Sequence, residues 1–386
     1  MNDDPRIGPL RDWLLGEGAR LRFLERLLAA FGARLGAAGL PIDRASLHAR
    51  ILHPQFMGAR LVWVPGEDQA AIYLAGHDLF TDPVFQRSPV RLVFEGADGL
   101  RQRLEWSGDD DEFPILTELR AAGFTDYVAM PLPLSTGQRL AATWATRRPG
   151  GFATDELLVL DALAPVLAMA AEVRLVRRLA RTLATTYLGE RTGEWVLEGR
   201  IRRGDLERIE AVVWFLDMRD FTALAERLDP DRLIDRLNRF FEAFGAPIAA
   251  HGGEILKFIG DAMLAVFTGP ADEPCRALAA ARAGFANLDA LNAALLGEGQ
   301  PAIDCGLALH RGSLSYGNIG TATRLDFTVI GPAVNEAARL QRVGRDLGAP
   351  LILSASFAGA CGAPTRSLGH HSVAGLERPI EVFAPA

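Results

Sequence analysis

The chain has 386 residues, of which 49% are hydrophobic and 23% are charged, and its net charge is −7. This length predicts two or three domains with sizeable cores, and the acidic balance argues against a nucleic-acid-binding protein. Three cysteines without C-x-x-C spacing indicate reduced thiols rather than a disulfide framework or a zinc site. The acidic N-terminus and the lack of a run of about 18 apolar residues predict a cytoplasmic protein that does not associate with membranes.

The N-terminal third of the sequence predicts a helical segment followed by a sheet. Apolar residues recur at helical spacing over 11–38, and we expect a helical segment at 1–44. A hairpin is predicted over 132–146, around a Ser-Thr-Gly turn. Short apolar runs predict strands at 60–64, 90–94 and 127–132.

A long helix is then expected from Thr154 to about Leu188, with an interruption at Pro165. One side of this helix carries a stripe of apolar residues at spacings of three and four: Met169, Val173, Val176, Leu179 and Leu183. The stripe fits either a dimer seam or a surface that packs on its own domain. Residues 189–210 are rich in glycine and charge, which is typical of a connector.

The order of elements in residues 45–172 resembles a GAF-type sensor module. The likeness lies in a central antiparallel sheet, a late hairpin and a closing helix that follows Gly-Phe-Ala-Thr-Asp-Glu. It implies an α/β sensor domain for an unknown ligand or signal. Residues 173–207 are then expected to form a helical linker to a further domain.

Lys257 is the only lysine, since every other basic residue among the 41 is an arginine. A lysine retained against such a bias suggests a position that needs a compact, movable charge rather than a rigid guanidinium fork. A chance survivor on a solvated strand is the alternative that this feature alone leaves open.

Two aspartates are predicted at the ends of strands. Asp217 closes an apolar run, and Asp261 lies in a two-residue turn between strands expected at 255–259 and 262–267. Alone, each would be an ordinary cap or turn residue. Two adjacent carboxylates raise each other's pKa unless a cation lies between them, and oxygen ligands of this kind suit Mg²⁺ or Mn²⁺.

A further helix is predicted after Gly331, with Pro332 at its first position. Asn335 and Arg339 are one turn apart and therefore share a face of this helix. Without other context, such a pair is usually part of a solvated surface.

Residues from about 208 to 384 resemble the catalytic domain of class III nucleotide cyclases. Four segments match in order: Phe-Leu-Asp-Met-Arg-Asp-Phe-Thr (215–222), Lys-Phe-Ile-Gly-Asp (257–261), Tyr-Gly-Asn-Ile-Gly (316–320) and Asp-Phe-Thr-Val-Ile-Gly-Pro-Ala-Val-Asn-Glu-Ala-Ala-Arg-Leu (326–340). The resemblance implies a ferredoxin-like βαββαβ catalytic domain over 208–386, so the whole chain is expected to be α+β.

The resemblance also implies roles for individual residues. Asp217 and Asp261, with the backbone of Met218, match the ligands of two Mg²⁺ or Mn²⁺ ions per site. Lys257 and Thr328 match the positions that read the purine. The lysine can donate to N1 of adenine, and the threonine can accept from its amino group, so ATP is the expected substrate.

Four further residues match the nucleotide-handling positions of the family. Phe221 and Thr222 begin a helix whose free backbone N–H groups would receive phosphate oxygens. Asn335 and Arg339 match the pair that orients the ribose and stabilises the pentavalent transition state.

The sequence departs from the family pattern in two places. Asp220 stands where a small residue is usual, which adds negative charge near the phosphates. The expected triphosphate-binding lysine is absent from the late segment, where Arg378 is the candidate substitute.

The resemblance implies an adenylate cyclase that converts ATP to 3′,5′-cyclic AMP and pyrophosphate. In this family the site forms between two catalytic domains, and one chain carries both residue sets, so a homodimer regulated by its N-terminal module is expected. A non-catalytic regulatory dimer is one alternative, although all six metal, base-reading and catalytic positions are filled. Guanylate cyclase is the other, and Lys257 and Thr328 disfavour it.

Overall fold

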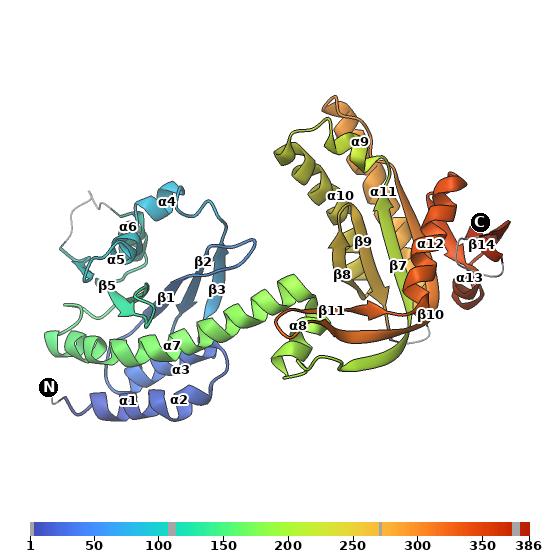
Figure 1. Ribbon diagram of the computed structural model, residues 1–386. Coiled ribbons are helices and arrows are strands. Elements are labelled where there is room, and N and C mark those ends of the chain that lie inside the picture. Colours follow the sequence, from blue (N-terminus) through green and yellow to red (C-terminus); the bar gives the residue numbers. More distant parts are fainter. Residues whose placement is uncertain (1–3, 107–112, 270–271, 373–378) are drawn as a thin grey trace. The chain divides into compact units, whose positions relative to one another are not determined.

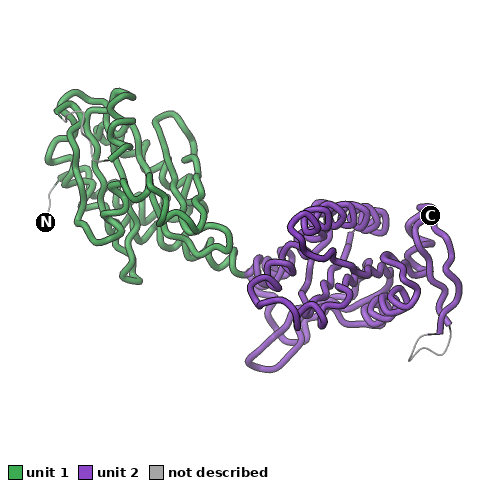
Figure 2. The backbone as a smooth tube through the Cα atoms, turned by 90° about the horizontal axis from the view of Figure 1, so that it is seen from above, with its two compact units in different colours: residues 1–183 green, residues 184–386 purple. Residues whose placement is uncertain are grey.

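The computed structural model describes residues 4–106, 113–269, 272–372 and 379–386. The chain divides into an N-terminal unit, Met1–Leu183, and a C-terminal unit, Ala184–Ala386 (Figure 2). The expected finer boundaries, at 44, 172 and 207, remain predictions. Within the described residues, no helix combines the length and the apolar character needed to cross a lipid bilayer.

The N-terminal unit is a six-stranded antiparallel sheet in the order β3-β2-β1-β6-β5-β4, with helices on both faces (Figure 1). Its strands are β1 (Arg44–Arg50), β2 (Gly58–Trp63), β3 (Ala71–Ala75), β4 (Leu100–Arg103), β5 (Asp126–Pro133) and β6 (Arg139–Thr146). Its helices are α1 (Ile7–Leu15), α2 (Glu17–Arg20), α3 (Leu24–Ala37), α4 (Pro83–Gln86), α5 (Pro89–Phe94), α6 (Pro114–Ala121) and α7 (Thr154–Leu188), which continues across the unit boundary.

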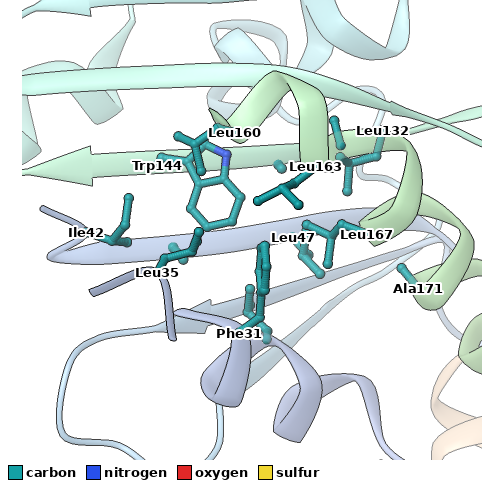
Figure 3. Close-up of a cluster of buried hydrophobic side chains, with 14 of the residues drawn as sticks. Phe31, Leu35, Ile42, Leu47, Leu132, Trp144, Leu160, Leu163, Leu167 and Ala171 are labelled. Atoms are coloured by element: carbon teal, nitrogen blue, oxygen red, sulfur yellow. The ribbon is translucent and has the colours of Figure 1, made fainter. Parts of the chain in front are cut away.

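Side chains alternate between the two faces of this sheet and build a separate core on each. On one face, Trp144 and Leu47 pack with Phe31 of α3 and Leu163 of α7 (Figure 3). On the other face, Tyr127 and Ala141 pack with α5 and α6. Both faces of the sheet are therefore covered by helices.

Three expectations about the N-terminal half are wrong in detail. Residues 90–94 form helix α5 rather than a strand, because Ser88 caps the backbone N–H of Val90 and a proline takes the first helical position. The helical segment over 11–38 is split into α1, α2 and α3. Helix α7 runs through Pro165 without a break, and its apolar stripe is exposed at Met169, Val173, Val176 and Leu183.

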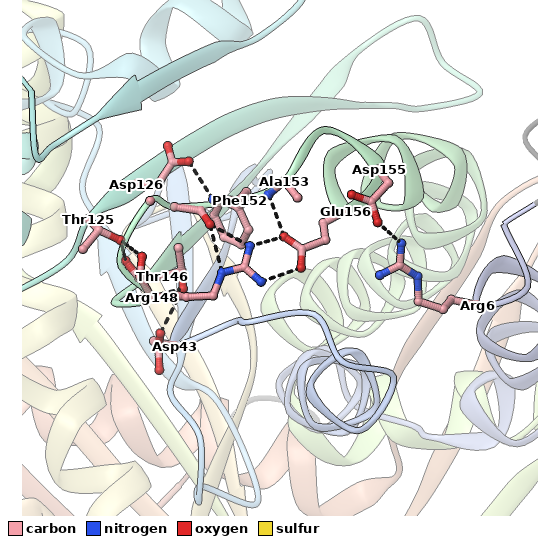
Figure 4. A network of polar contacts seen from close by, with 12 residues as sticks. Arg6, Asp43, Thr125, Asp126, Thr146, Arg148, Phe152, Ala153, Asp155 and Glu156 are labelled. Atoms are coloured by element: carbon pink, nitrogen blue, oxygen red, sulfur yellow. Dashed lines mark hydrogen bonds and ion pairs between the residues drawn. The ribbon is translucent and has the colours of Figure 1, made fainter.

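The turn between β6 and α7 is held by two buried carboxylates, Asp126 and Glu156 (Figure 4). Asp126 accepts from the backbone N–H of Phe152 at 2.9 Å and pairs with Arg101 at 2.6 Å. Gly151 has φ +71°, and a Cβ there would lie 2.4 Å from the Asp126 carboxylate. Only glycine fits this close approach without displacing the carboxylate.

The C-terminal unit contains an eight-stranded sheet in the order β13-β14-β12-β10-β7-β9-β8, with β11 paired to β10. Its strands are β7 (Leu206–Met218), β8 (Gly253–Ile259), β9 (Ala262–Phe267), β10 (Cys305–Gly320), β11 (Leu325–Ile330), β12 (Leu351–Ser354), β13 (Thr365–His371) and β14 (Ile380–Pro385). Its helices are α8 (Glu190–Leu197), within the expected connector, and α9 (Phe221–Ala225), α10 (Pro230–Ala250), α11 (Glu273–Gly297), α12 (Pro332–Asp346) and α13 (Ala355–Cys361).

The centre of this sheet has the βαββαβ arrangement predicted for the C-terminal domain. Strands β7, β8, β9 and β10, with α10 and α11 as connections, lie in the order β10-β7-β9-β8. Helices α10 and α11 cover one face through Phe240, Phe244 and Leu288. Helix α12 packs on the opposite face through Ala333 and Ala337 (Figure 1). This packing places the start of α9 and one side of α12 near the ends of β7 and β9.

We predict that Asp126→Ala lowers the free energy of unfolding of the N-terminal unit by about 3 kcal/mol, because it leaves a guanidinium and a buried N–H group without their acceptor. Urea unfolding followed by circular dichroism measures the change. Asp68→Ala, at an exposed position of the same unit, is the matched control and should leave the midpoint of the urea transition unchanged. Equal stability of both variants would contradict a structural role for the Asp126 contacts.

Candidate functional site

Asp217 and Asp261 lie together at one end of the sheet. Asp217 stands on β7 opposite Ala262, the first residue of β9, so the register places it beside the β8–β9 turn that holds Asp261. The Met218 N–H donates to the Asp261 carbonyl oxygen at 3.4 Å, which ties the two segments together. Both aspartates and Met218 line a cavity of about 580 Å³, which we call the carboxylate cavity.

The segment after Asp217 turns sharply into α9 and adds to the same cavity. Asp220 has φ +56° and ψ +26°. Among the described residues, it is the only residue other than glycine that has a positive φ. Arg219 anchors the turn, because its guanidinium pairs with Asp304 at 3.0 Å and donates to the Ala349 carbonyl at 3.0 Å. Phe221 and Thr222, at the start of α9, line the carboxylate cavity as well.

One side of α12 forms the opposite wall of the carboxylate cavity. Gln341 donates from Nε2 to the Asp217 carboxylate at 3.1 Å, and the Arg345 guanidinium forms an ion pair with the same oxygen. Arg342 also lines the cavity. The cavity therefore contains acidic groups from β7, the β8–β9 turn and the turn before α9, together with two guanidinium groups from α12.

The electrostatics of this cavity favour a bound cation. Burial raises the pKa of Asp217 above its ordinary value, and the neighbouring Asp261 raises it further, while Arg345 and Gln341 act in the opposite direction. A divalent ion between the carboxylates would remove the repulsion, and oxygen donors suit Mg²⁺ or Mn²⁺. No group of three or more His, Cys, Asp or Glu side chains is placed to hold a metal in the described parts of the chain. A nucleotide phosphate or water would complete the shell.

Lys257 and Thr328 lie outside the carboxylate cavity. The Lys257 ammonium, on β8, forms an ion pair with Asp326 of β11. Thr328 is buried on β11, and strand alternation places it on the same face as Asp326. Lys257 and Asp326 together line a second cavity of about 950 Å³.

The remaining predicted residues are also outside the carboxylate cavity. Asn335 is exposed on α12, and Arg339 is half-buried one turn later. Their side of α12 differs from the side that carries Gln341 and Arg345. Arg378 lies outside the described residues.

Sequence reasoning missed Gln341, Arg345 and Asp326. The first two contact Asp217 across 124 and 128 positions of sequence, and Asp326 contacts Lys257 across 69 positions. Gln341 and Arg345 are one turn apart on α12, and this spacing is the local signal that could have assigned them to one face of the helix.

Comparison with known proteins identifies the C-terminal region. Residues 206–351 match the adenylate and guanylate cyclase catalytic domain. Adenylate cyclase 1 of Rhizobium meliloti (strain 1021) is 29% identical over 181 residues, which cover 46% of this chain and 27% of that protein. An adenylate cyclase of Anabaena cylindrica is 34% identical over 148 residues, which cover 37% of this chain and 29% of that protein. The chain thus spans under a third of each of these two relatives.

Among solved structures, a bacterial light-regulated adenylyl cyclase is 27% identical and covers 57% of this chain and 64% of its own, with a TM-score of 0.48. The guanylyl cyclase Cya2 is 26% identical and covers 46% of this chain and 91% of its own, with a TM-score of 0.42. Both scores are too low to carry an argument about the fold. The four motifs and the match over 206–351 instead identify the family: the C-terminal unit of this chain carries a class III catalytic domain of the adenylate and guanylate cyclase family.

Proposed function

We propose that the protein is an adenylate cyclase that converts ATP to 3′,5′-cyclic AMP and pyrophosphate. The observation that carries the proposal is the carboxylate cavity, where Asp217 and Asp261 lie beside the first turn of α9. Carboxylates that bind divalent ions, next to free backbone N–H groups, suit a nucleoside triphosphate. The named adenylate cyclases among its relatives support the same reaction class.

In this mechanism Asp217, Asp261 and the Met218 carbonyl would hold two divalent ions, Mg²⁺ or Mn²⁺. The ions, when bound, lower the pKa of the ribose 3′-hydroxyl and neutralise the triphosphate. The N–H groups at Phe221 and Thr222 receive phosphate oxygens. The chain itself orients the nucleotide for attack on the α-phosphorus.

Arg345 is a candidate for the role of the triphosphate-binding lysine, which the late segment lacks. In the free chain its guanidinium satisfies Asp217, and Arg342 faces the same cavity. If the carboxylates held a divalent ion, both guanidinium groups would be available to the β- and γ-phosphates. Arginine suits this contact because its fork can bind phosphate through two parallel hydrogen bonds. Arg378 remains a second candidate for the same role.

The proposal includes a homodimer, because within one chain the metal-binding carboxylates lie apart from the base-reading and catalytic residues. The carboxylate cavity holds neither the base-reading pair, Lys257 and Thr328, nor the catalytic pair, Asn335 and Arg339. A second copy would bring these pairs to the first copy's carboxylates, and twofold symmetry would give two equivalent sites. The exposed apolar stripe of α7 supports self-association, since an uncovered row of this kind is a natural contact surface.

Preference for ATP over GTP is part of the proposal and rests on Lys257 and Thr328. The Asp326 carboxylate holds the lysine ammonium on the face of β11 that also carries the threonine. An ammonium is a donor, which matches N1 of adenine and meets another donor at N1 of guanine. The alternative is guanylate cyclase activity, and an assay with ATP and GTP distinguishes the two activities.

Purified protein incubated with Mn²⁺ and either ATP or GTP should form cyclic AMP from ATP, identified by mass spectrometry. Asp217→Ala should reduce turnover by at least about a thousandfold, because it removes a metal ligand from the reacting centre. Asp346→Ala, at an exposed position of α12, is the matched control and should retain activity. Full Mn²⁺-dependent activity of Asp217→Ala would refute the metal assignment.

The double variant Lys257→Glu, Thr328→Cys should shift the preference from ATP toward GTP by about a hundredfold or more in kcat/KM, because a carboxylate accepts from the donors at N1 and N2 of guanine. Competition between the two nucleotides in one reaction measures the shift. Unchanged selectivity for ATP would show that these residues do not read the base.

Mixing the inactive variants Asp217→Ala and Arg339→Ala should restore roughly a quarter of wild-type activity, because half of randomly paired dimers are mixed and each mixed dimer has one intact site. Each variant alone is the control. A mixture that stays inactive after subunit exchange, verified by co-purification of differently tagged chains, would exclude a shared site.

A further inference from the structure

The N-terminal unit contains a cavity of about 480 Å³ that the proposed reaction does not use. It lies on the face of the sheet that carries Arg44, Ser46 and His48 of β1, opposite the core formed by Leu47 and helix α7. Strand pairing adds Arg60 to this face, since it stands opposite His48 on β2. Helices α4, α5 and α6 supply the other walls. We call this space the sensor cavity.

The floor of the sensor cavity is a fixed polar network. Ser46 Oγ lies 2.9 Å from Nε2 of His48 and 2.5 Å from Oγ1 of Thr143, and Thr143 also hydrogen-bonds Tyr127. Burial lowers the pKa of His48 to about 3, and the nearby Arg60 and Arg44 act in the same direction. Burial raises the pKa of Tyr127 above its ordinary value. Both groups are therefore neutral near pH 7, and the charge on this floor comes from the arginines.

Arg44 and Arg60 carry positive charge that nearby carboxylates leave uncompensated. Neither guanidinium forms an ion pair with a described residue, and Arg60 stacks on the Tyr73 ring at 4.7 Å. Two acids also line the cavity: Glu118 acts on Arg44 only as a distant charge, and Asp82 accepts from the Val84 N–H at 2.6 Å to cap α4. Because burial disfavours a charged guanidinium, an anion beside Arg44 would stabilise the site.

The rest of the wall is apolar. Leu79, Val84, Phe85, Phe94 and Ile115 face the same space from α4, α5, α6 and the segment before α4. The volume lies within the usual range of about 300–1,000 Å³ for small-molecule sites, which combine apolar walls with a few polar groups. The lining therefore matches a ligand that has one acidic group and an apolar body.

We propose that the sensor cavity binds a small organic carboxylate, whose acidic group contacts Arg44 and Arg60 and whose aromatic or branched apolar body lies against α4 and α5. The polar floor of Thr143, Tyr127 and His48 offers further hydrogen bonds to the same ligand. This proposal rests on the N-terminal unit alone and does not depend on the cyclase reaction.

Isothermal titration calorimetry of the full chain with benzoate, phenylacetate and indole-3-acetate tests the proposal, with each uncharged amide as the paired probe. We expect at least one carboxylate to bind with a Kd in the millimolar range or lower. Its amide should bind at least about tenfold more weakly, because the amide cannot form the charge-assisted hydrogen bond. Failure of every carboxylate to bind, or equal binding of acid and amide, would overturn the proposal.

Variants locate the binding on the chain. Arg44→Gln and Arg60→Gln should each weaken the carboxylate about tenfold or more, whereas Arg26→Gln, at an exposed position of α3, should not. Ala75→Phe should block binding by filling the cavity while leaving both arginines in place. Thermal unfolding of each free variant identifies those that fold, and only the affinities of folded variants are compared. Wild-type affinity in every folded cavity variant would place the binding elsewhere and reject the site.

Discussion

The repulsion between Asp217 and Asp261 is the interaction on which the C-terminal unit depends. The antiparallel register of β7 and β9 fixes the two carboxylates at one end of the sheet, where burial and then the neighbouring Asp261 raise the pKa of Asp217. The free chain offsets part of this shift with Arg345 and Gln341 from α12. The packing of α12 on the sheet therefore does two things: it partly neutralises the Asp217 carboxylate, and it places the Arg342 and Arg345 guanidinium groups along the carboxylate cavity.

Local chemistry explains what the sequence could predict. The Gly-Asp turn predicted the pairing of β8 and β9, and the apolar run that Asp217 closes predicted its place at a strand end, because both signals lie within a few residues. The prediction for residues 90–94 was wrong because β-branched residues outweighed a cap that was also present, Ser88 followed by a proline. The predicted interruption at Pro165 was wrong because side-chain burial offsets the energetic cost of the proline. A proline inside a helix costs about 3 kcal/mol, but Leu160, Leu163 and Leu167 bury their side chains around it, and each such burial contributes about 2 kcal/mol.

The partners of the site residues could not be predicted, because they depend on tertiary packing. The Asp326 carboxylate contacts the Lys257 ammonium although β11 and β8 are not adjacent strands. The Arg345 guanidinium contacts Asp217 because of the way α12 packs on the sheet. Sequence spacing identifies which residues share a face of a helix, but it does not identify the residues that this face contacts in the folded chain. The composition bias gave one real clue. In a chain that otherwise uses arginine, the single ammonium pairs with one carboxylate, a contact that a movable point charge makes readily.

Several buried charges among the described residues are matched by the chain itself. Asp126 pairs with Arg101, Glu156 with Arg148, and the Arg174 guanidinium donates to the carbonyls of Leu21 and Gly18. Among the described residues, charge of one sign also gathers in two cavities: the paired carboxylates of the C-terminal unit, which Arg345 offsets only in part, and Arg44 and Arg60 on the sheet of the N-terminal unit. Uncompensated charge in a cavity is costly, so a fold that keeps it needs a compensating partner from outside. The opposite signs are the physical basis on which the two proposed ligands differ: a cation with its nucleotide in one cavity and an organic anion in the other.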